Sequence, residues 1–370
     1  MKPFVLAAGG TGGHRFPAEA LAGELIARGR AVHLLSDARA DVFAGTLAGL
    51  NVHRVRAGRP GGGPIRNARA LAGLAAGAVQ AGRLLRRLSP AGVIGFGGYP
   101  SVPTMLAATC LGLPTVIHEQ NAVLGRANRL LASRMGYIAT GFPSIDGLRP
   151  TDRARATCTG NPVRPTVLAA GEVAYRPPSP GGPVELLVLG GSQGARIFSE
   201  ILPPALAALP APLRTALRVS QQARVEDLAA AARRYAEAGV AAELDSFFAD
   251  VPRRLARAHL VICRAGASTV AELAAVGRPA LLVPYPYAAD DHQTANARTF
   301  AAAGGGWVVA QPDLDAVMLA GRLEQLFADG ARLTAAAQRA LRFGRRDAAR
   351  RLARLALALE PAGIGQERAA

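Results

Sequence analysis

Short apolar runs, each followed by a helix-forming stretch, recur along this chain and limit the folds that it can adopt. In the first half they lie at residues 4–8, 31–36, 92–96 and 115–118. The segments between them, such as residues 17–28, are rich in residues that favour helix. Runs that are apolar throughout are typical of strands buried on both faces of a parallel sheet. The alternation therefore predicts a doubly wound α/β fold.

The same pattern starts again in the second half. The apolar run at residues 184–189 leads into G-G-S-Q-G, much as the run at 4–8 leads into G-G-T-G-G. Further strand–helix pairs are expected at 259–263 with 268–276 and at 280–284 with 292–302. A chain of 370 residues, at about 150 residues per domain, also suggests two domains.

We expect two Rossmann-like domains that face a cleft. The first comprises residues 1–162 with a C-terminal helix at 345–370, and the second comprises residues 183–344. A linker is expected at 163–182, where Pro and Gly cluster. The Arg-rich stretch 332–359 is predicted to be helical. It is either a solvated helix or one that packs back across the first domain.

The charge balance suggests an anionic partner. The net charge is +17, and nearly all of the positive charge is Arg. Nucleic acid, a phosphorylated substrate or a membrane surface would each fit. Aromatic residues make up only 5% of the chain, which is thin for base stacking and disfavours nucleic acid. Three scattered cysteines without a C-x-x-C motif argue against a disulfide framework and a zinc site, and fit a reducing cytosol.

Two apolar stretches raise the question of a membrane. Residues 91–117 carry no charge, but Gly and Pro interrupt them, so we interpret them as a strand, a loop, a short helix and a strand. Residues 65–88 form an amphipathic helical pattern flanked by arginines. This helix either covers the core or docks on anionic lipid. The flanking arginines are Arg66, Arg69, Arg83, Arg86 and Arg87.

The first glycine-rich turn, residues 9–13, follows a strand and precedes a helix. Such a turn lets a ligand approach the backbone, and a helix N-terminus offers free N–H groups to an anion. The dinucleotide fingerprint fits only in part, because Arg15 occupies its last Gly position, although Asp37 would suit a ribose. A tight turn without a ligand is the structural alternative. His14 is either a packed residue or a neutral base.

Two acidic segments of the second half have ordinary structural interpretations. Thr269 and Glu272 match a capping box, which the sequence by itself favours over a carboxylate that accepts hydrogen bonds from ribose hydroxyls. Asp and His at 290–292 suggest a metal, but no third ligand stands at a useful spacing. The D-x-D at 313–315 is interpreted as a helix start. We therefore expect no metal at either place.

Taken together, the motifs resemble the MurG family of bacterial N-acetylglucosaminyltransferases, within glycosyltransferase family 28. The resemblance spans nearly the whole chain. It rests on G-G-T-G-G-H at 9–14, G-G-Y-P-S-V-P at 97–103, H-E-Q-N at 118–121, G-N-P-V-R at 160–164, G-G-S-Q-G-A at 190–195, C-R-A-G-A-S-T-V-A-E at 263–272 and D-H-Q-T-A-N-A at 291–297.

The resemblance implies a GT-B fold and a reaction without metal or other cofactor. N-acetylglucosamine would pass from UDP-N-acetylglucosamine, with inversion, to the C4 hydroxyl of undecaprenyl-diphospho-N-acetylmuramoyl-pentapeptide. The protein would act as a peripheral protein at the cytoplasmic face of the bacterial inner membrane, whose anionic surface it would meet.

The resemblance also implies site residues. On the donor side it points to Thr11, Gly12, Gly13, Asn121, Arg164, Ser192, Phe248, Ala267, Ser268, Thr269, Glu272, Gln293 and Asn296. The backbone of Phe248 would meet the uracil. The turn at 9–13, His14 and Tyr99 would face the acceptor diphosphate. His14 is the first candidate for the base, with Glu119 and Asn121 as alternatives. Arg15 stands where the family often has an apolar residue.

Three rival functions stay open at this point. An NAD(P)-dependent oxidoreductase would use Asp37 and the first turn, but both fingerprints are broken. A UDP-sugar epimerase would act on the sugar nucleotide without any acceptor. A non-enzymatic RNA- or membrane-binding protein would explain the charge but would leave the two glycine turns without a role.

Overall fold

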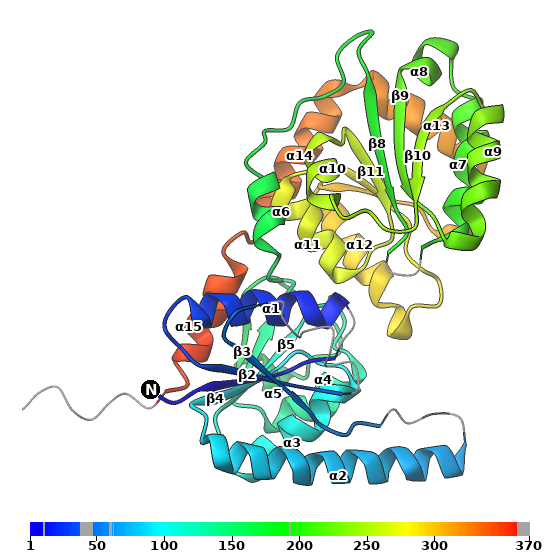
Figure 1. Ribbon diagram of the computed structural model, residues 1–370. Coiled ribbons are helices and arrows are strands. Elements are labelled where there is room, and N and C mark those ends of the chain that lie inside the picture. The colour runs from blue at the N-terminus through cyan, green and yellow to red at the C-terminus, as the bar shows by residue number, and fades with distance from the viewer. Residues whose placement is uncertain (10–11, 38–46, 59–60, 62, 192–193, 361–370) are drawn as a thin grey trace, which may run out of the picture. The chain divides into compact units, whose positions relative to one another are not determined.

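The chain divides into two compact units in a computed structural model. One comprises Met1–Arg164 with Arg346–Ala370, and the other comprises Pro165–Arg345 (Figure 1). The structure describes all residues except 10–11, 38–46, 59–60, 62, 192–193 and 361–370. Within the described residues, no helix is both long enough and apolar enough to cross a bilayer.

The first unit is built on a parallel sheet, as predicted. Its strand order among the described residues is β3-β2-β1-β4-β5-β6-β7. The strands are β1 (Phe4–Ala7), β2 (Val32–Ser36), β3 (Leu50–Arg54), β4 (Gly92–Gly95), β5 (Thr115–Glu119), β6 (Tyr137–Thr140) and β7 (Ala156–Cys158). The order reverses between β1 and β4, and such a switch point opens a crevice at the carboxyl ends of the strands.

Helices cover both faces of this sheet. α1 and α15 pack together on one face, and α2 and α3 pack together on the other (Figure 1). The helices of the unit are α1 (Gly12–Ile26), α2 (Pro64–Leu88), α3 (Val102–Cys110), α4 (Arg126–Leu131), α5 (Pro150–Arg153) and α15 (Ala348–Leu357). The stretch 91–117 forms β4, a short 3-10 turn, α3 and β5, which confirms the interpretation given to it.

The C-terminal helix belongs to the core of the first unit. Leu352 and Ala356 of α15 are fully buried in the same cluster as Phe4 of β1. A Cβ added at Gly92 would lie 2.5 Å from Leu359 Cδ1. Leu359 can therefore pack against β4 only because residue 92 has no side chain. The Arg30 guanidinium also donates to the Glu360 carboxylate, with 2.9 Å between Nη1 and Oε2. Apolar burial and an ion pair therefore fix α15 on the sheet.

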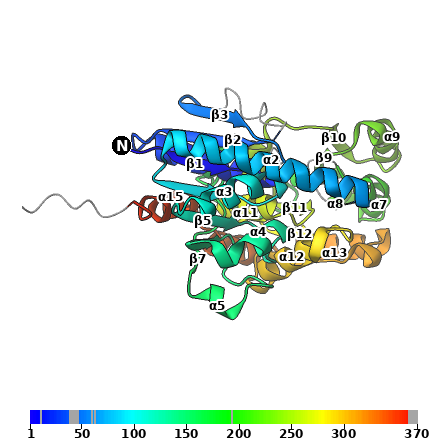
Figure 2. The same cartoon turned by 90° about the horizontal axis from the view of Figure 1, so that it is seen from below.

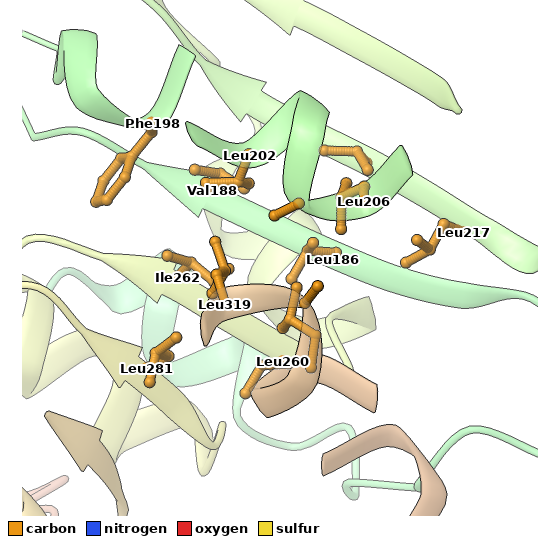
Figure 3. Close-up of a cluster of buried hydrophobic side chains, with 14 of the residues drawn as sticks. Leu186, Val188, Phe198, Leu202, Leu206, Leu217, Leu260, Ile262, Leu281 and Leu319 are labelled. Atoms are coloured by element: carbon orange, nitrogen blue, oxygen red, sulfur yellow. The ribbon is translucent and has the colours of Figure 1, made fainter. Parts of the chain in front are cut away.

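The second unit repeats the plan, with strand order β10-β9-β8-β11-β12-β13 among the described residues. Its strands are β8 (Val184–Leu189), β9 (Leu217–Gln222), β10 (Ala241–Asp245), β11 (Leu260–Cys263), β12 (Ala280–Leu282) and β13 (Gly306–Val308). Its helices are α6 (Pro165–Ala170), α7 (Arg196–Ala207), α8 (Ala211–Ala216), α9 (Leu228–Glu237), α10 (Val251–Arg257), α11 (Ala267–Val276), α12 (His292–Ala302), α13 (Ala316–Ala328) and α14 (Gly330–Phe343). Figure 3 shows Leu186 and Val188 of β8 packed with Leu202 of α7 and Leu319 of α13.

Three predicted segments differ from the structure. The helix expected from residue 17 begins at Gly12, because Pro17 lies inside α1 and does not start it. The helical stretch at 332–359 is broken between α14 and α15, where Gly344 is extended and a Cβ would lie 2.6 Å from Ala274 O. The expected linker at 163–182 contains α6, which packs against α10 and α11.

A buried arginine ties several elements of the second unit together. Arg278 is 1% exposed. Its guanidinium donates to the backbone carbonyls of Val173, Leu255, Ala256, Val276 and Gly277 at 2.6–3.1 Å. Four of these carbonyls lie at the C-terminal ends of α10 and α11, where carbonyls lack intrahelical partners and carry partial negative charge. The charge of Arg278 is therefore balanced by helix ends.

We predict that Arg278→Met lowers the free energy of unfolding by about 3–5 kcal/mol, because it leaves several buried carbonyls without donors. Urea and thermal unfolding would measure the loss. Arg233→Met, on the exposed side of α9, is the matched control and should stay within about 0.5 kcal/mol of the parent. Equal midpoints for the two variants would contradict the role given to Arg278.

Candidate active site

In the first unit, the candidate residues gather at the carboxyl ends of the strands. α1 follows β1, and it carries Gly12, Gly13 and His14 in its first turn. Thr11 lies outside the described residues. Arg164 places its guanidinium 4.5 Å from the centre of the Phe16 ring, so it lies beside the same end of α1. Tyr99 follows β4 in a short 3-10 turn and is half-buried.

His14 is joined to the end of β5 by side-chain hydrogen bonds. His14 Nδ1 lies 3.0 Å from Gln120 Oε1, and Gln120 Nε2 lies 2.9 Å from His118 Nδ1. His118 Nε2 lies 3.0 Å from the carbonyl oxygen of Gly160, which follows β7. Burial lowers the pKa of His118 to about 4, so its ring stays neutral at physiological pH.

Glu119 organises the loop that follows β5. It is 2% exposed, and its carboxylate accepts hydrogen bonds from Asn121 N (3.0 Å), Asn121 Nδ2 (3.2 Å), Gly125 N (2.9 Å) and Asn128 Nδ2 (2.8 Å). A buried carboxylate needs such donors, because an unpaired buried polar group is costly. These contacts give Glu119 a positioning role, and they also fix the Asn121 side chain.

In the second unit, the loops after β8 and β11 each lead into a helix. A Cβ added at Gly190 would lie 2.4 Å from Ala195 N, so the turn before α7 requires glycine there. Ser192 of this turn lies outside the described residues. α11 begins at Ala267, and its N-cap Gly266 has no side-chain capping bond. The capping box predicted at Thr269 and Glu272 is therefore wrong, because the helix starts before Thr269.

Two residues of α12 hold the loop that leads into α11. Gln293 Oε1 accepts from Ala265 N at 3.2 Å and from Tyr285 N at 3.0 Å. Asn296 Nδ2 donates to Ala265 O at 3.0 Å. The two side chains are three residues apart and so lie on one helix face. They fix the position of the α11 N-terminus.

Arg254 and its partners anchor the segment around Phe248. The Arg254 guanidinium lies 4.0 Å from the centre of the Phe248 ring. It donates to both Glu243 oxygens at 2.6 Å, to Asp250 Oδ1 at 2.7 Å and to Ser220 Oγ at 2.8 Å. The hydrogen bonds from Arg254 lower the pKa values of Glu243 and Asp250. Sequence reasoning missed Arg254, because Ser220 and Glu243 lie on the neighbouring strands β9 and β10, and an Asp–Arg pair four residues apart, as with Asp250, is common on helix surfaces.

Three further features concern metal binding, a helix start and a groove. Among the described residues, no group of three or more His, Cys, Asp or Glu side chains lies close enough to hold a metal ion. Asp315 caps α13, with its carboxylate accepting from Met318 N at 2.8 Å, which confirms the helix start predicted at 313–315. A groove of about 900 Å³ runs along β8, β9, β10 and α10, and it is lined by Arg254 but by none of the predicted site residues that the structure describes.

The structure thus assembles two groups of predicted residues, one in each unit. The first comprises Gly12, Gly13, His14, Tyr99, Glu119, Asn121 and Arg164. The second comprises Phe248, Ala267, Ser268, Thr269, Glu272, Gln293 and Asn296. Glu119 is the last residue of β5, and the other members follow the carboxyl end of a strand or lie on the helix after it, as ligand sites of doubly wound sheets do.

Comparison with known proteins agrees with this architecture. Residues 4–140 match the glycosyltransferase family 28 N-terminal domain, and residues 185–352 match the family's C-terminal domain. The UDP-N-acetylglucosamine–N-acetylmuramyl-(pentapeptide) pyrophosphoryl-undecaprenol N-acetylglucosamine transferase of Rhodospirillum centenum is 56% identical, over 100% of this chain and 97% of its own. The transferase of the same name from Paramagnetospirillum magneticum is 54% identical, over 97% and 98%.

Solved structures of glycosyltransferases are also similar to this chain. MurG of Acinetobacter baumannii superposes with a TM-score of 0.79 at 30% identity, covering 97% of this chain and 100% of that one. The calicheamicin glycosyltransferase CalG4, at 20% identity and a TM-score of 0.64, shares the fold, with 97% of this chain and 98% of its own covered. The predicted resemblance and the GT-B class of fold are confirmed. The chain belongs to glycosyltransferase family 28.

Proposed function

We propose that the protein transfers N-acetylglucosamine from UDP-N-acetylglucosamine to the C4 hydroxyl of undecaprenyl-diphospho-N-acetylmuramoyl-pentapeptide, with inversion. The observation that carries this proposal is full-length similarity, at 56% and 54% identity, to two transferases named for these substrates. The helix starts beside the candidate residues suit the two diphosphates that such a reaction brings together.

On the donor side, the diphosphate would lie at the start of α11. Val270 N is bonded to Gly266 O, so the amides of Ala267, Ser268 and Thr269 precede the first intrahelical bond. Glu272, one turn further along α11, would accept hydrogen bonds from the ribose hydroxyls. Ser192 and the turn before α7 would bind the same diphosphate, and the Phe248 backbone would bind the uracil.

Catalysis then consists of stabilising the departing UDP and deprotonating the acceptor. Each helix N-terminus contributes about 0.3–1 kcal/mol, and a preorganised donor aimed at developing charge contributes about 3 kcal/mol. Several such donors, together with Arg164, would stabilise the negative charge on the departing UDP in place of a metal ion. The muramoyl hydroxyl attacks the anomeric carbon, UDP leaves from the opposite face, and His14 accepts the hydroxyl proton.

A surface of α2 suits an anionic membrane. α2 packs beside α3, and its first turns extend beyond α3 (Figure 1, Figure 2). Ala81 and Leu85 of α2 are buried, whereas Leu71 is 61% exposed. Ile65 and Val79 are 71% and 54% exposed. We give the name α2 surface to these two side chains together with the exposed arginines Arg69, Arg83, Arg86 and Arg87. It would hold the protein at the cytoplasmic face of the inner membrane.

The function is tested by incubating the protein with labelled UDP-N-acetylglucosamine, with and without the lipid acceptor. We expect label in the lipid, with one UDP released per sugar transferred, only when acceptor is present. EDTA should leave the rate unchanged. Conversion of the sugar nucleotide without acceptor would indicate an epimerase instead. Loss of activity in EDTA, restored by Mg²⁺, would contradict the metal-free mechanism.

We predict that Arg254→Met raises the KM for the donor about tenfold and changes kcat little. If the ordered Phe248 segment of the variant lies about 1.4 kcal/mol above the disordered one, about one molecule in ten is ready to bind uracil. Steady-state kinetics and calorimetry with UDP would measure this. Arg253→Met is the control, because Arg253 is 73% exposed and contacts Asp250 only at 3.6 Å. Equal KM values in both variants would remove Arg254 from this role.

We predict that changing Arg69, Arg83 and Arg87 to Gln weakens binding to vesicles that contain anionic lipid about a hundredfold. Each Arg near such a surface contributes about 1 kcal/mol. Vesicle co-sedimentation would measure binding, with neutral vesicles as the lipid control. Arg233→Gln, at an exposed position of α9 in the second unit, serves as the protein control. Binding that is indifferent to lipid charge would contradict the docking surface.

A further inference from the structure

A line of hydrogen bonds runs from the interior of the first unit to the ring of His14. It passes from Gly160 O through His118 and Gln120 to His14 Nδ1, with steps of 3.0, 2.9 and 3.0 Å. His118 is fully buried and Gln120 is 2% exposed. His14 is half-buried and is the candidate base of the proposed function. The direction of each bond therefore decides which nitrogen of His14 accepts a proton.

The orientation of the Gln120 amide follows from a backbone carbonyl. Gln120 Nε2 lies 2.9 Å from His118 O, and a carbonyl oxygen can only accept. The amide group that faces it must be the NH₂. Its second hydrogen is directed at His118 Nδ1, also at 2.9 Å, so this nitrogen accepts. His118 Nε2 must then carry the proton and donate to Gly160 O, which is again an acceptor.

With the amide fixed, its oxygen faces His14. Gln120 Oε1 accepts, so the proton of the neutral His14 ring lies on Nδ1, and Nε2 is the basic nitrogen. We infer that Gln120 is a positioning residue, which fixes His14 in the tautomer whose Nε2 takes the proton from the acceptor hydroxyl. This inference rests on the proposed function for the reaction, but the tautomer itself is a property of the protein alone.

The surroundings make this arrangement rigid. Asn161 Nδ2 donates to Gln120 O at 2.8 Å, and Asn128 Nδ2 donates to His118 O at 3.3 Å. The neutral state of His118 keeps its Nδ1 as an acceptor. A Cβ added at Gly98, where φ is +70°, would lie 3.1 Å from His14 Nε2. The Nε2 edge therefore faces the glycine turn after β4, which leads directly to Tyr99.

The tautomer is tested by nuclear magnetic resonance on protein labelled with ¹⁵N-histidine. Long-range ¹H–¹⁵N spectra distinguish a protonated from an unprotonated ring nitrogen, and His14→Ala identifies the His14 signals. We expect Nδ1–H in the parent protein and loss of that preference in Gln120→Met, which removes the acceptor. Gln338→Met, exposed on α14, is the matched control and should keep the parent spectrum.

The parent spectrum covers the case in which Gln120→Met does not fold, because it reports the tautomer of His14 without any substitution at residue 120. A parent spectrum with Nε2–H, or a folded Gln120→Met protein that keeps Nδ1–H, would overturn the inference. These spectra need no substrate, so failure of the transfer assay and failure of this inference are distinguishable.

Kinetics then tests whether the tautomer matters for turnover. Gln120→Met should lower kcat about 10–100-fold, with the donor KM within about twofold of the parent. In a His14→Ala background, the same change should cause less than about a twofold further loss, because a residue that acts through His14 has no effect without it. Losses that multiply in the double variant would show that Gln120 supports only the general structure and would overturn its positioning role.

Discussion

The carboxyl end of β5 places three polar side chains in succession inside the first unit, and each must find partners because unpaired buried polar groups are costly. His118 reaches the backbone after β7, Glu119 holds the loop before α4, and Gln120 reaches α1. A single strand end thus connects elements that are far apart in sequence. Movement of any one partner would leave a buried donor or acceptor unpaired, so the network fixes the position of the candidate residues more firmly than apolar packing alone.

The second unit uses the same principle at the carboxyl end of β11. The guanidinium of Arg264 donates to Val283 O and Pro284 O, both at 3.1 Å, and to Gln311 Oε1 at 2.6 Å. These bonds join the loop before α11 to the segment after β12, and Gln293 joins the same two segments from α12. The N-terminus of α11 is therefore oriented by bonds from its own loop to the segment after β12, to α12 and to Gln311. Helix amides can bind an anion strongly only when their direction is fixed in this way.

The parts of the fold that the sequence predicts are those buried on both faces. The run at 184–189 coincides with β8, because a central parallel strand is apolar throughout. β9 and β10, at one side of the sheet, carry no such signal, since polar residues interrupt β9 and no residue of β10 is fully buried. Motifs located the candidate residues, but they could not show that Gln120 lies between two histidines. That contact joins residues 106 positions apart and depends on the parallel sheet, which places the carboxyl ends of β1 and β5 at one edge.

The structure also changes how the net charge of +17 is interpreted. Arg278 and Arg264 donate to backbone carbonyls at the ends of helices and strands, so each adds a positive charge that serves the fold. Burial lowers the pKa of both guanidinium groups, and they remain charged because an Arg pKa is so high. Only part of the excess of Arg over acidic residues is therefore available to attract anions. The charges that would attract a membrane are the exposed ones that lie among exposed apolar side chains, as on the α2 surface. There, burial of apolar side chains and attraction to anionic lipid would both favour membrane binding.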